Sequence, residues 1–241
     1  MEVAEKKPRL KTLKAEMRQV LMERFGMRGH HHSNIWIFYS AKTQRDWAVS
    51  SDLEFDFAVL AESNPEIVGF DLNPPEVMIK VGGEDCMTRF DAVLRYATPR
   101  LEAIELKYSR DQESDEGPRV TAQRAAQTAA AERDGMTYRR VTERDLEPHQ
   151  MKIVNWRRIL AFLAAVRAID ISSERDLVAI KLSAAGEGIT LGELIEDAEP
   201  SSHPAMLAAA FRLVQEGHYE ADFGTKALSL GSRLVRKAVA A

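Results

Sequence analysis

The spacing of hydrophobic residues predicts a mixture of helices and strands over the first 150 residues of the chain. Apolar positions three or four apart indicate amphipathic helices within residues 10–25 and residues 53–61. Short runs rich in β-branched and aromatic residues indicate strands between and after them. We expect these strands at residues 35–39, 67–70, 76–81, 87–96 and 101–108.

Residues typical of turns and helices indicate how these strands and helices follow one another along the chain. Gly82-Gly83 is typical of a two-residue hairpin turn. An alanine-rich stretch over residues 119–134 predicts a helix that Gly135 ends, and residues 138–141 form a short strand. A helix, antiparallel strands, a helix and a final strand predict an α/β domain, a mixed sheet flanked by helices that ends near Pro148.

From residue 149 onward the pattern becomes mostly helical. We expect helices over residues 153–169 and 172–182, a short helix that begins within residues 188–195, and a helix over residues 203–216, followed by a small β-wing over residues 217–222 and 226–230. This order is typical of a winged-helix module, which binds DNA or docks partners. The sequence therefore predicts two domains, residues 1–148 and residues 149–241.

The predicted recognition helix of that module, residues 203–216, carries little positive charge. Arg212 is its one basic side chain of the Lys/Arg type, and Glu216 opposes it. Sequence-specific readout needs side chains that donate to base edges. We therefore favour a role in docking protein or DNA backbone, and DNA reading stays the alternative.

Charge and composition narrow the classes of partner. The net charge of −4 over 241 residues excludes a general polycation, so any nucleic-acid contact must come from local basic patches. One patch is the basic N-terminal helix with Lys11 and Lys14, which is either a solvated face or a surface for DNA phosphate or a partner. The single Cys86 excludes a disulfide framework and a cysteine-based zinc site. We expect a cytoplasmic protein, because no signal peptide or membrane-spanning apolar run is evident.

A constellation of acidic and basic residues lies in the middle of the chain. Side chains alternate between the faces of a strand, so Glu105 and Lys107 point to one face, where Asp91 on the neighbouring strand can reach. Carboxylate oxygens suit hard cations such as Mg²⁺, and an adjacent lysine can position a water. This combination predicts a hydrolytic metal site for phosphodiesters. The alternative is a solvated polar strand face.

Glu54 has two interpretations. Ser51 followed by Glu54 is the capping-box pattern at the start of a helix, so Glu54 could serve the helix terminus alone. It could also present a third carboxylate to the metal.

Several short motifs, in order, resemble the TnsA-type transposon endonuclease domain. They are residues 51–57 (SDLEFDF), 64–68 (NPEIV), 73–75 (NPP), Asp91, residues 105–107 (ELK) and 141–146 (VTERDL). The likeness extends over most of the chain from residue 45. Phe90 stands where the family motif often has proline, and Glu105 stands where some members have glutamine.

The resemblance implies a restriction-endonuclease-like fold and a Mg²⁺-dependent site at which Mn²⁺ would substitute. It implies that Lys107 orients the attacking water and that the DNA backbone runs near Gln123 and Arg124. The implied metal ligands are the carboxylates of Glu54, Asp91 and Glu105 and the carbonyl of Leu106.

The resemblance also implies a biological role and partners. The family is one subunit of a heteromeric cut-and-paste transposase and cleaves the 5′ (non-transferred) strands of double-stranded DNA at transposon ends. A TnsB-like, integrase-like subunit cuts and joins the 3′ ends, and a TnsC-like AAA ATPase regulates both. Two alternatives remain: a stand-alone restriction or repair nuclease of the same fold, and a non-catalytic DNA-binding assembly subunit.

Overall fold

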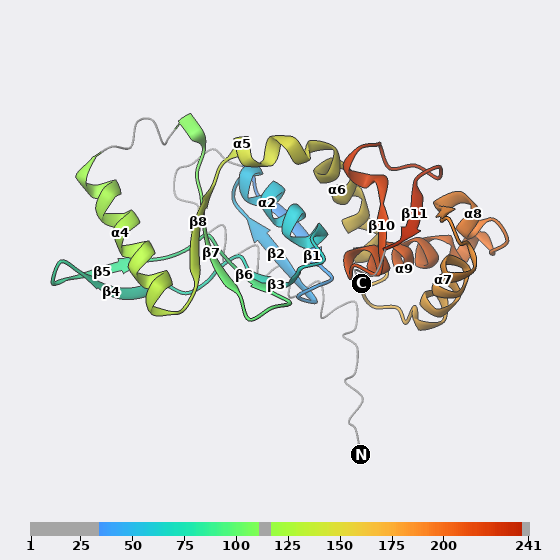
Figure 1. Ribbon diagram of the computed structural model, residues 1–241, viewed down its shortest axis with the longest axis horizontal. Helices are drawn as coiled ribbons and strands as arrows, with labels where there is room; N and C mark the ends of the chain where they lie inside the picture. Colours follow the sequence, from blue (N-terminus) through green and yellow to red (C-terminus); the bar gives the residue numbers. More distant parts are fainter. Residues whose placement is uncertain (1–33, 111–116, 238–241) are drawn as a thin grey trace, which may run out of the picture. The chain divides into compact units, whose positions relative to one another are not determined.

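The computed structural model describes residues 34–110 and 117–237 (Figure 1). Contacts divide the chain into two units, residues 51–150 and residues 1–50 together with residues 151–241. The division near residue 150 lies close to the predicted one, but residues 34–50 belong with the C-terminal segment. One reason is an ion pair of 2.6 Å between the buried Asp46 and Arg167. A buried charge needs such a partner, which ties the two segments into one unit.

A four-stranded mixed sheet forms the centre of the unit over residues 51–150, as the sequence pattern predicts. Its strand order is β3-β6-β7-β8, with antiparallel pairing except between the parallel strands β7 and β8. The strands are β3 (Ile67–Asp71), β6 (Ala92–Tyr96), β7 (Leu101–Leu106) and β8 (Thr137–Val141). The unit is therefore an α/β domain.

Two long helices flank this sheet, α2 (Asp52–Ser63) and α4 (Pro118–Arg133) (Figure 1). α2 begins where Ser51 accepts a hydrogen bond from the main-chain N–H of Glu54, and its apolar side chains are buried. α4 packs against the sheet through small residues such as Ala130 and Ala131, next to Phe90 and Ala103. Alanine lets the helix backbone approach the sheet closely, which brings the polar side chains of α4 near β7.

A separate hairpin precedes β6. It pairs β4 (Val77–Val81) with β5 (Glu84–Thr88), and its turn uses Gly82 and Gly83 at φ values of 61° and 92°, as the sequence predicts. The single strand predicted over residues 87–96 is wrong. The chain leaves the hairpin after Thr88, buries Phe90 against α4, and enters the main sheet at Ala92. Asp91 therefore lies in the bend before β6.

In the other unit, the described residues begin with a hairpin of β1 (Trp36–Ser40) and β2 (Arg45–Val49), of which the sequence pattern predicts only the first strand. Four helices and a three-stranded sheet of order β10-β11-β9 follow. They are α6 (Gln150–Ala165), α7 (Ser172–Ala184), β9 (Ile189–Thr190), α8 (Leu191–Ile195), α9 (His203–Gln215), β10 (Tyr219–Ala221) and β11 (Arg233–Arg236).

The second strand of the predicted wing is displaced. It lies at β11, beyond the predicted residues 226–230. The side chain of Asn155 in α6 donates to the carbonyls of Phe223 and Lys226 and accepts from the N–H of Leu228, over 2.7 to 2.8 Å. These main-chain groups are bound to a side chain and cannot pair with a neighbouring strand.

The helix predicted as the recognition helix is largely buried. Every residue of α9 from Met206 to Phe211 is buried, and Arg212 forms an ion pair of 3.2 Å with Glu216. The buried side chains from Met206 to Phe211 are therefore not available to contact a DNA groove. Separately, no helix among the described residues is long and apolar enough to cross a membrane.

Candidate active site

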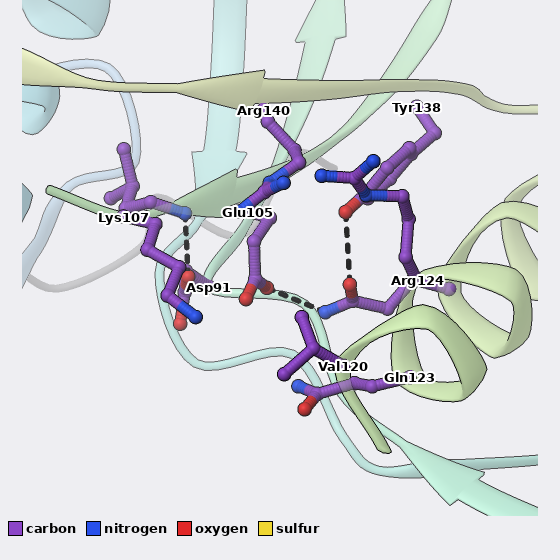
Figure 2. Close-up of a pocket in the computed structure, with 10 residues that line it drawn as sticks. Asp91, Glu105, Lys107, Val120, Gln123, Arg124, Tyr138 and Arg140 are labelled. Atoms are coloured by element: carbon purple, nitrogen blue, oxygen red, sulfur yellow. Dashed lines mark hydrogen bonds between the residues drawn. The ribbon is translucent and has the colours of Figure 1, made fainter. Parts of the chain in front are cut away.

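Asp91, Glu105 and Lys107 line one pocket in the α/β unit, with a volume of about 200 Å³ (Figure 2). They come from the bend before β6, from the end of β7 and from the residue after it. The sequence pattern therefore identifies three residues that the fold brings together. The rest of the lining is Leu106, Val120, Gln123, Arg124, Gln127, Tyr138 and Arg140, from β7, α4 and β8.

The main chain of β7 fixes Asp91. The N–H of Leu106 donates to Asp91 Oδ2 over 2.7 Å, and the N–H of Asp91 donates to the carbonyl of Ile104 over 2.9 Å. Lys107 continues the pairing beyond the strand, because its N–H donates to the carbonyl of Val141 over 3.1 Å. Two of the three polar groups therefore have their backbones anchored to the sheet next to Glu105.

The two carboxyl groups are electrostatically unfavourable neighbours. Burial, followed by the negative charge of Glu105, raises the pKa of Asp91 to about 7. Burial also raises the pKa of Glu105, against the opposing effects of Gln127 and Lys107 and of a hydrogen bond with Asp91. Two buried carboxylates in contact stay ionised together only with a compensating charge. A bound cation would supply that charge.

Gln127 holds the Glu105 carboxylate from the opposite side. Its Nε2 donates to Glu105 Oε2 over 2.5 Å and to the carbonyl of Arg89 over 3.2 Å. Its Oε1 accepts from the hydroxyl of Tyr138 over 2.9 Å. Figure 2 shows this chain of contacts running from β8 through α4 to Glu105.

Basic side chains border the acidic pair. Lys107, Arg124 and Arg140 all line the pocket, from the end of β7, from α4 and from β8. Basic side chains cannot coordinate a metal ion. They can bind an anion that a metal ion between the two carboxylates would also bind. Phosphate has this property, since its oxygens accept from guanidinium groups and coordinate hard metals.

Glu54 does not join the pocket lining. Its main-chain N–H and its carboxylate both contact Ser51 Oγ, over 3.1 and 3.2 Å, at the start of α2. Its charge still raises the pKa of Asp91, after burial and after Glu105. In the described part of the chain no three His, Cys, Asp or Glu residues are grouped closely enough to hold a metal ion. The direct three-carboxylate site predicted from the sequence is therefore not formed, and a water-mediated role of Glu54 stays a prediction.

The remaining donors still suit Mg²⁺. Asp91 and Glu105 offer carboxylate oxygens in one pocket, and Leu106 between Glu105 and Lys107 can add its carbonyl. Mg²⁺ usually keeps several waters and binds through one or two carboxylates plus substrate phosphate. Two carboxylates bordered by basic side chains are compatible with that requirement, and Mn²⁺ accepts the same ligands.

The other predicted contacts have mixed outcomes. Gln123 and Arg124 line the pocket from α4, and their contact with DNA stays a prediction. Lys11 and Lys14 lie outside the described residues. The sequence pattern missed Gln127, Tyr138 and Arg140. A signal existed for each: Gln127 is one helical turn after Gln123, and Tyr138 and Arg140 share one face of their strand.

Comparisons with known proteins give no family. No protein-family model matches the chain, and no curated protein matches it. The functional interpretation therefore depends on the site and on the sequence motifs.

Proposed function

We propose that this chain is a metal-dependent DNA endonuclease in which Asp91, Glu105 and the Leu106 carbonyl hold Mg²⁺. One observation carries the proposal: Asp91, Glu105 and Lys107 line a single pocket. Glu105 and Lys107 follow Asp91 by 14 and 16 residues in the sequence. Burial and mutual repulsion oppose the ionisation of this carboxylate pair, and perturbed carboxylates of this kind cluster at functional sites. The chemistry that these groups support is phosphodiester hydrolysis.

Each side chain has a role in that reaction. Asp91 and Glu105 bind the cation, and Lys107 orients the attacking water and offsets negative charge that develops on the phosphate. Arg124 and Arg140 bind non-bridging oxygens of the same or a neighbouring phosphate. When bound, Mg²⁺ would polarise the phosphate and lower the pKa of the water.

The order of elements supports a restriction-endonuclease-like fold for residues 51–150. α2, the antiparallel strands β3, β6 and β7, the helix α4 and the parallel strand β8 follow the order that the resemblance to TnsA-type domains leads us to expect. In the other unit, α7, β9, α8, α9, β10 and β11 have the order of a winged helix. The burial of α9 favours docking over base reading for this module.

On this basis we propose the finer role of a transposase subunit that cleaves the 5′ strands at transposon ends. A TnsB-like integrase-like subunit and a TnsC-like AAA ATPase would be its partners, and the motifs over residues 51–57 and 141–146 support the assignment. Inside the structure, the second of these motifs starts a helix: Thr142 and Asp145 form a capping box after β8.

A nicking assay tests the proposal. Duplex DNA carrying transposon ends is incubated with the chain, the partner transposase and Mg²⁺. We expect 5′-strand cleavage that Asp91→Ala and Lys107→Ala each reduce by at least about 100-fold. Asp85→Ala is the matched control, because Asp85 is an exposed carboxylate of the same unit that pairs only loosely with Lys80, over 3.8 Å. Undiminished cleavage by the first two variants would refute the site.

The same assay separates the alternatives. Cleavage by the purified chain without a partner would favour a stand-alone restriction or repair nuclease. DNA binding without any divalent-metal binding would favour a non-catalytic assembly subunit.

A further inference from the structure

Gln127 is a buried amide on an otherwise apolar helix face. Its side chain is 2% exposed, and its neighbours on the buried face of α4 are Ala126, Ala130 and Ala131. Burying an amide is unfavourable unless its donors and acceptor find partners. In this structure both N–H groups and the carbonyl oxygen have partners, so the position is built for a polar contact and not for packing alone.

The chemistry of those partners fixes the orientation of the amide. The main-chain carbonyl of Arg89 can only accept, and so can Glu105 Oε2 when Glu105 is ionised, so the NH₂ group must face them. The amide oxygen then faces Tyr138, whose hydroxyl must donate. Burial and the charge of Glu105 raise the pKa of Tyr138, which keeps this hydroxyl protonated. Tyr138 therefore specifies which end of Gln127 meets Glu105.

We propose that Gln127 and Tyr138 are positioning residues that orient the Glu105 carboxylate toward the cation, an inference that rests on the proposed function. Gln127 holds Oε2 and so restricts rotation of the carboxylate, which leaves Oε1 for the cation beside Asp91. Tyr138 acts one step further away, by keeping the amide of Gln127 in the donating orientation. Outer partners of this kind commonly change metal affinity by 10- to 100-fold.

Gln127 and Tyr138 should differ in the size of their effect on metal affinity. Without Gln127, Glu105 loses its fixed donor altogether. Without the Tyr138 hydroxyl, the carbonyl of Arg89 still favours the same orientation of the amide, because it accepts from Nε2. We therefore expect a larger effect from Gln127→Leu than from Tyr138→Phe. Since Tyr138 works only through Gln127, the effects should not add in the double variant.

The test measures Mn²⁺ affinity by titration calorimetry and the melting temperature of the metal-free chain. Gln127→Leu should weaken Mn²⁺ binding by about 10- to 100-fold and Tyr138→Phe by about 3- to 10-fold. In the Gln127→Leu background, Tyr138→Phe should weaken binding no further. Tyr96→Phe is the matched control: it removes a hydroxyl that donates to the buried Glu102 over 2.7 Å, outside the pocket. It should lower the melting temperature and leave Mn²⁺ affinity unchanged.

The outcomes are distinguishable. If the wild-type chain binds Mn²⁺ and both variants bind it equally well, the positioning role is overturned while the proposed function stands. Additive losses in the double variant would also overturn it. If Gln127→Leu does not fold, Tyr138→Phe with its control decides the question. Absence of Mn²⁺ binding by the wild-type chain overturns the proposed function, and the inference with it.

Discussion

The main-chain N–H of Leu106 donates to Asp91 Oδ2 over 2.7 Å, which links the bend before β6 to the strand that carries Glu105. The bond holds one carboxylate beside the other although burial and mutual repulsion oppose their ionisation. A main-chain hydrogen bond therefore positions Asp91 beside the strand that carries Glu105. This arrangement leads to several measurable consequences.

The first concerns the stability of the metal-free chain as a function of pH. The pKa of Asp91 rises from its ordinary 3.8 to about 7 in the folded state, so the folded chain keeps a proton that the unfolded chain releases. The free energy of unfolding therefore falls as the pH rises through that interval. At pH 8 we expect Asp91→Asn to stabilise the metal-free chain by on the order of 2 kcal/mol, measured by urea denaturation.

Asparagine keeps an acceptor for the N–H of Leu106, so this variant removes the charge and not the hydrogen bond. Asp85→Asn, at an exposed carboxylate, should change stability little. An Asp91→Asn variant that is less stable than the wild type at pH 8 would contradict the predicted cost of ionising this pair.

The second prediction concerns metal affinity. Mn²⁺ must displace the proton that Asp91 holds below about pH 7, so affinity should fall by about tenfold per pH unit as the pH decreases below that value. Calorimetry in buffers of different ionisation enthalpy should show proton release at pH 6 that disappears by pH 8. An affinity that is constant from pH 5.5 to 8 would contradict the assignment of Asp91 as a ligand.

The third prediction separates phosphate contacts from metal ligands. Arg124→Ala and Arg140→Ala should each weaken DNA binding and lower the slope of log affinity against log salt by about 1. Mn²⁺ affinity should stay within about twofold of the wild type, because neither guanidinium can bind a cation. Arg133→Ala is the control on the same helix, where the guanidinium pairs with Asp134 at 2.7 Å. Loss of Mn²⁺ binding in Arg124→Ala would contradict this division of roles.

The fourth prediction concerns the unit that contains α6. Asn155 is fully buried and its amide holds three main-chain groups between residues 223 and 228. Asn155→Ala should destabilise this unit by about 3 kcal/mol, because several buried polar groups lose their partner. Native-state hydrogen exchange of residues 222–232 reports the loss directly. A change below about 1 kcal/mol would show that water replaces the amide.

Much of the fold follows from local signals. α2 begins at its predicted capping residue Ser51, and the Gly82-Gly83 turn closes its predicted hairpin. The sequence pattern does not predict β2, because aspartate is uncommon in strands and the partner of the buried Asp46, Arg167, lies far along the chain. The bend at Asp91 was missed for a similar reason, since Phe90 leaves the strand path to pack against α4. Strand β2 and the bend at Asp91 both depend on contacts between residues far apart in the sequence, which the spacing of hydrophobic residues does not reveal.

In the candidate site, too, some features follow from local sequence and others depend on long-range packing. Alternation along β7 places Glu105 and Lys107 together, and their residue types indicate the chemistry. Gln127 and Tyr138 could not be connected to Glu105 from sequence, because the link requires α4 and β8 to pack around β7. Glu54 illustrates a motif that fits two roles: its carboxylate accepts from the Ser51 hydroxyl at the helix terminus, and a water-mediated role at the metal stays a prediction.

A single titration tests the central claim most directly. Mn²⁺ is titrated at pH 8 into the purified wild-type chain and into Asp91→Ala, with Asp85→Ala as control. We predict that the wild type and the control bind Mn²⁺ at a site that Asp91→Ala lacks. A wild-type chain that binds no Mn²⁺, or an Asp91→Ala chain that binds it undiminished, would contradict a metal centre at Asp91 and Glu105.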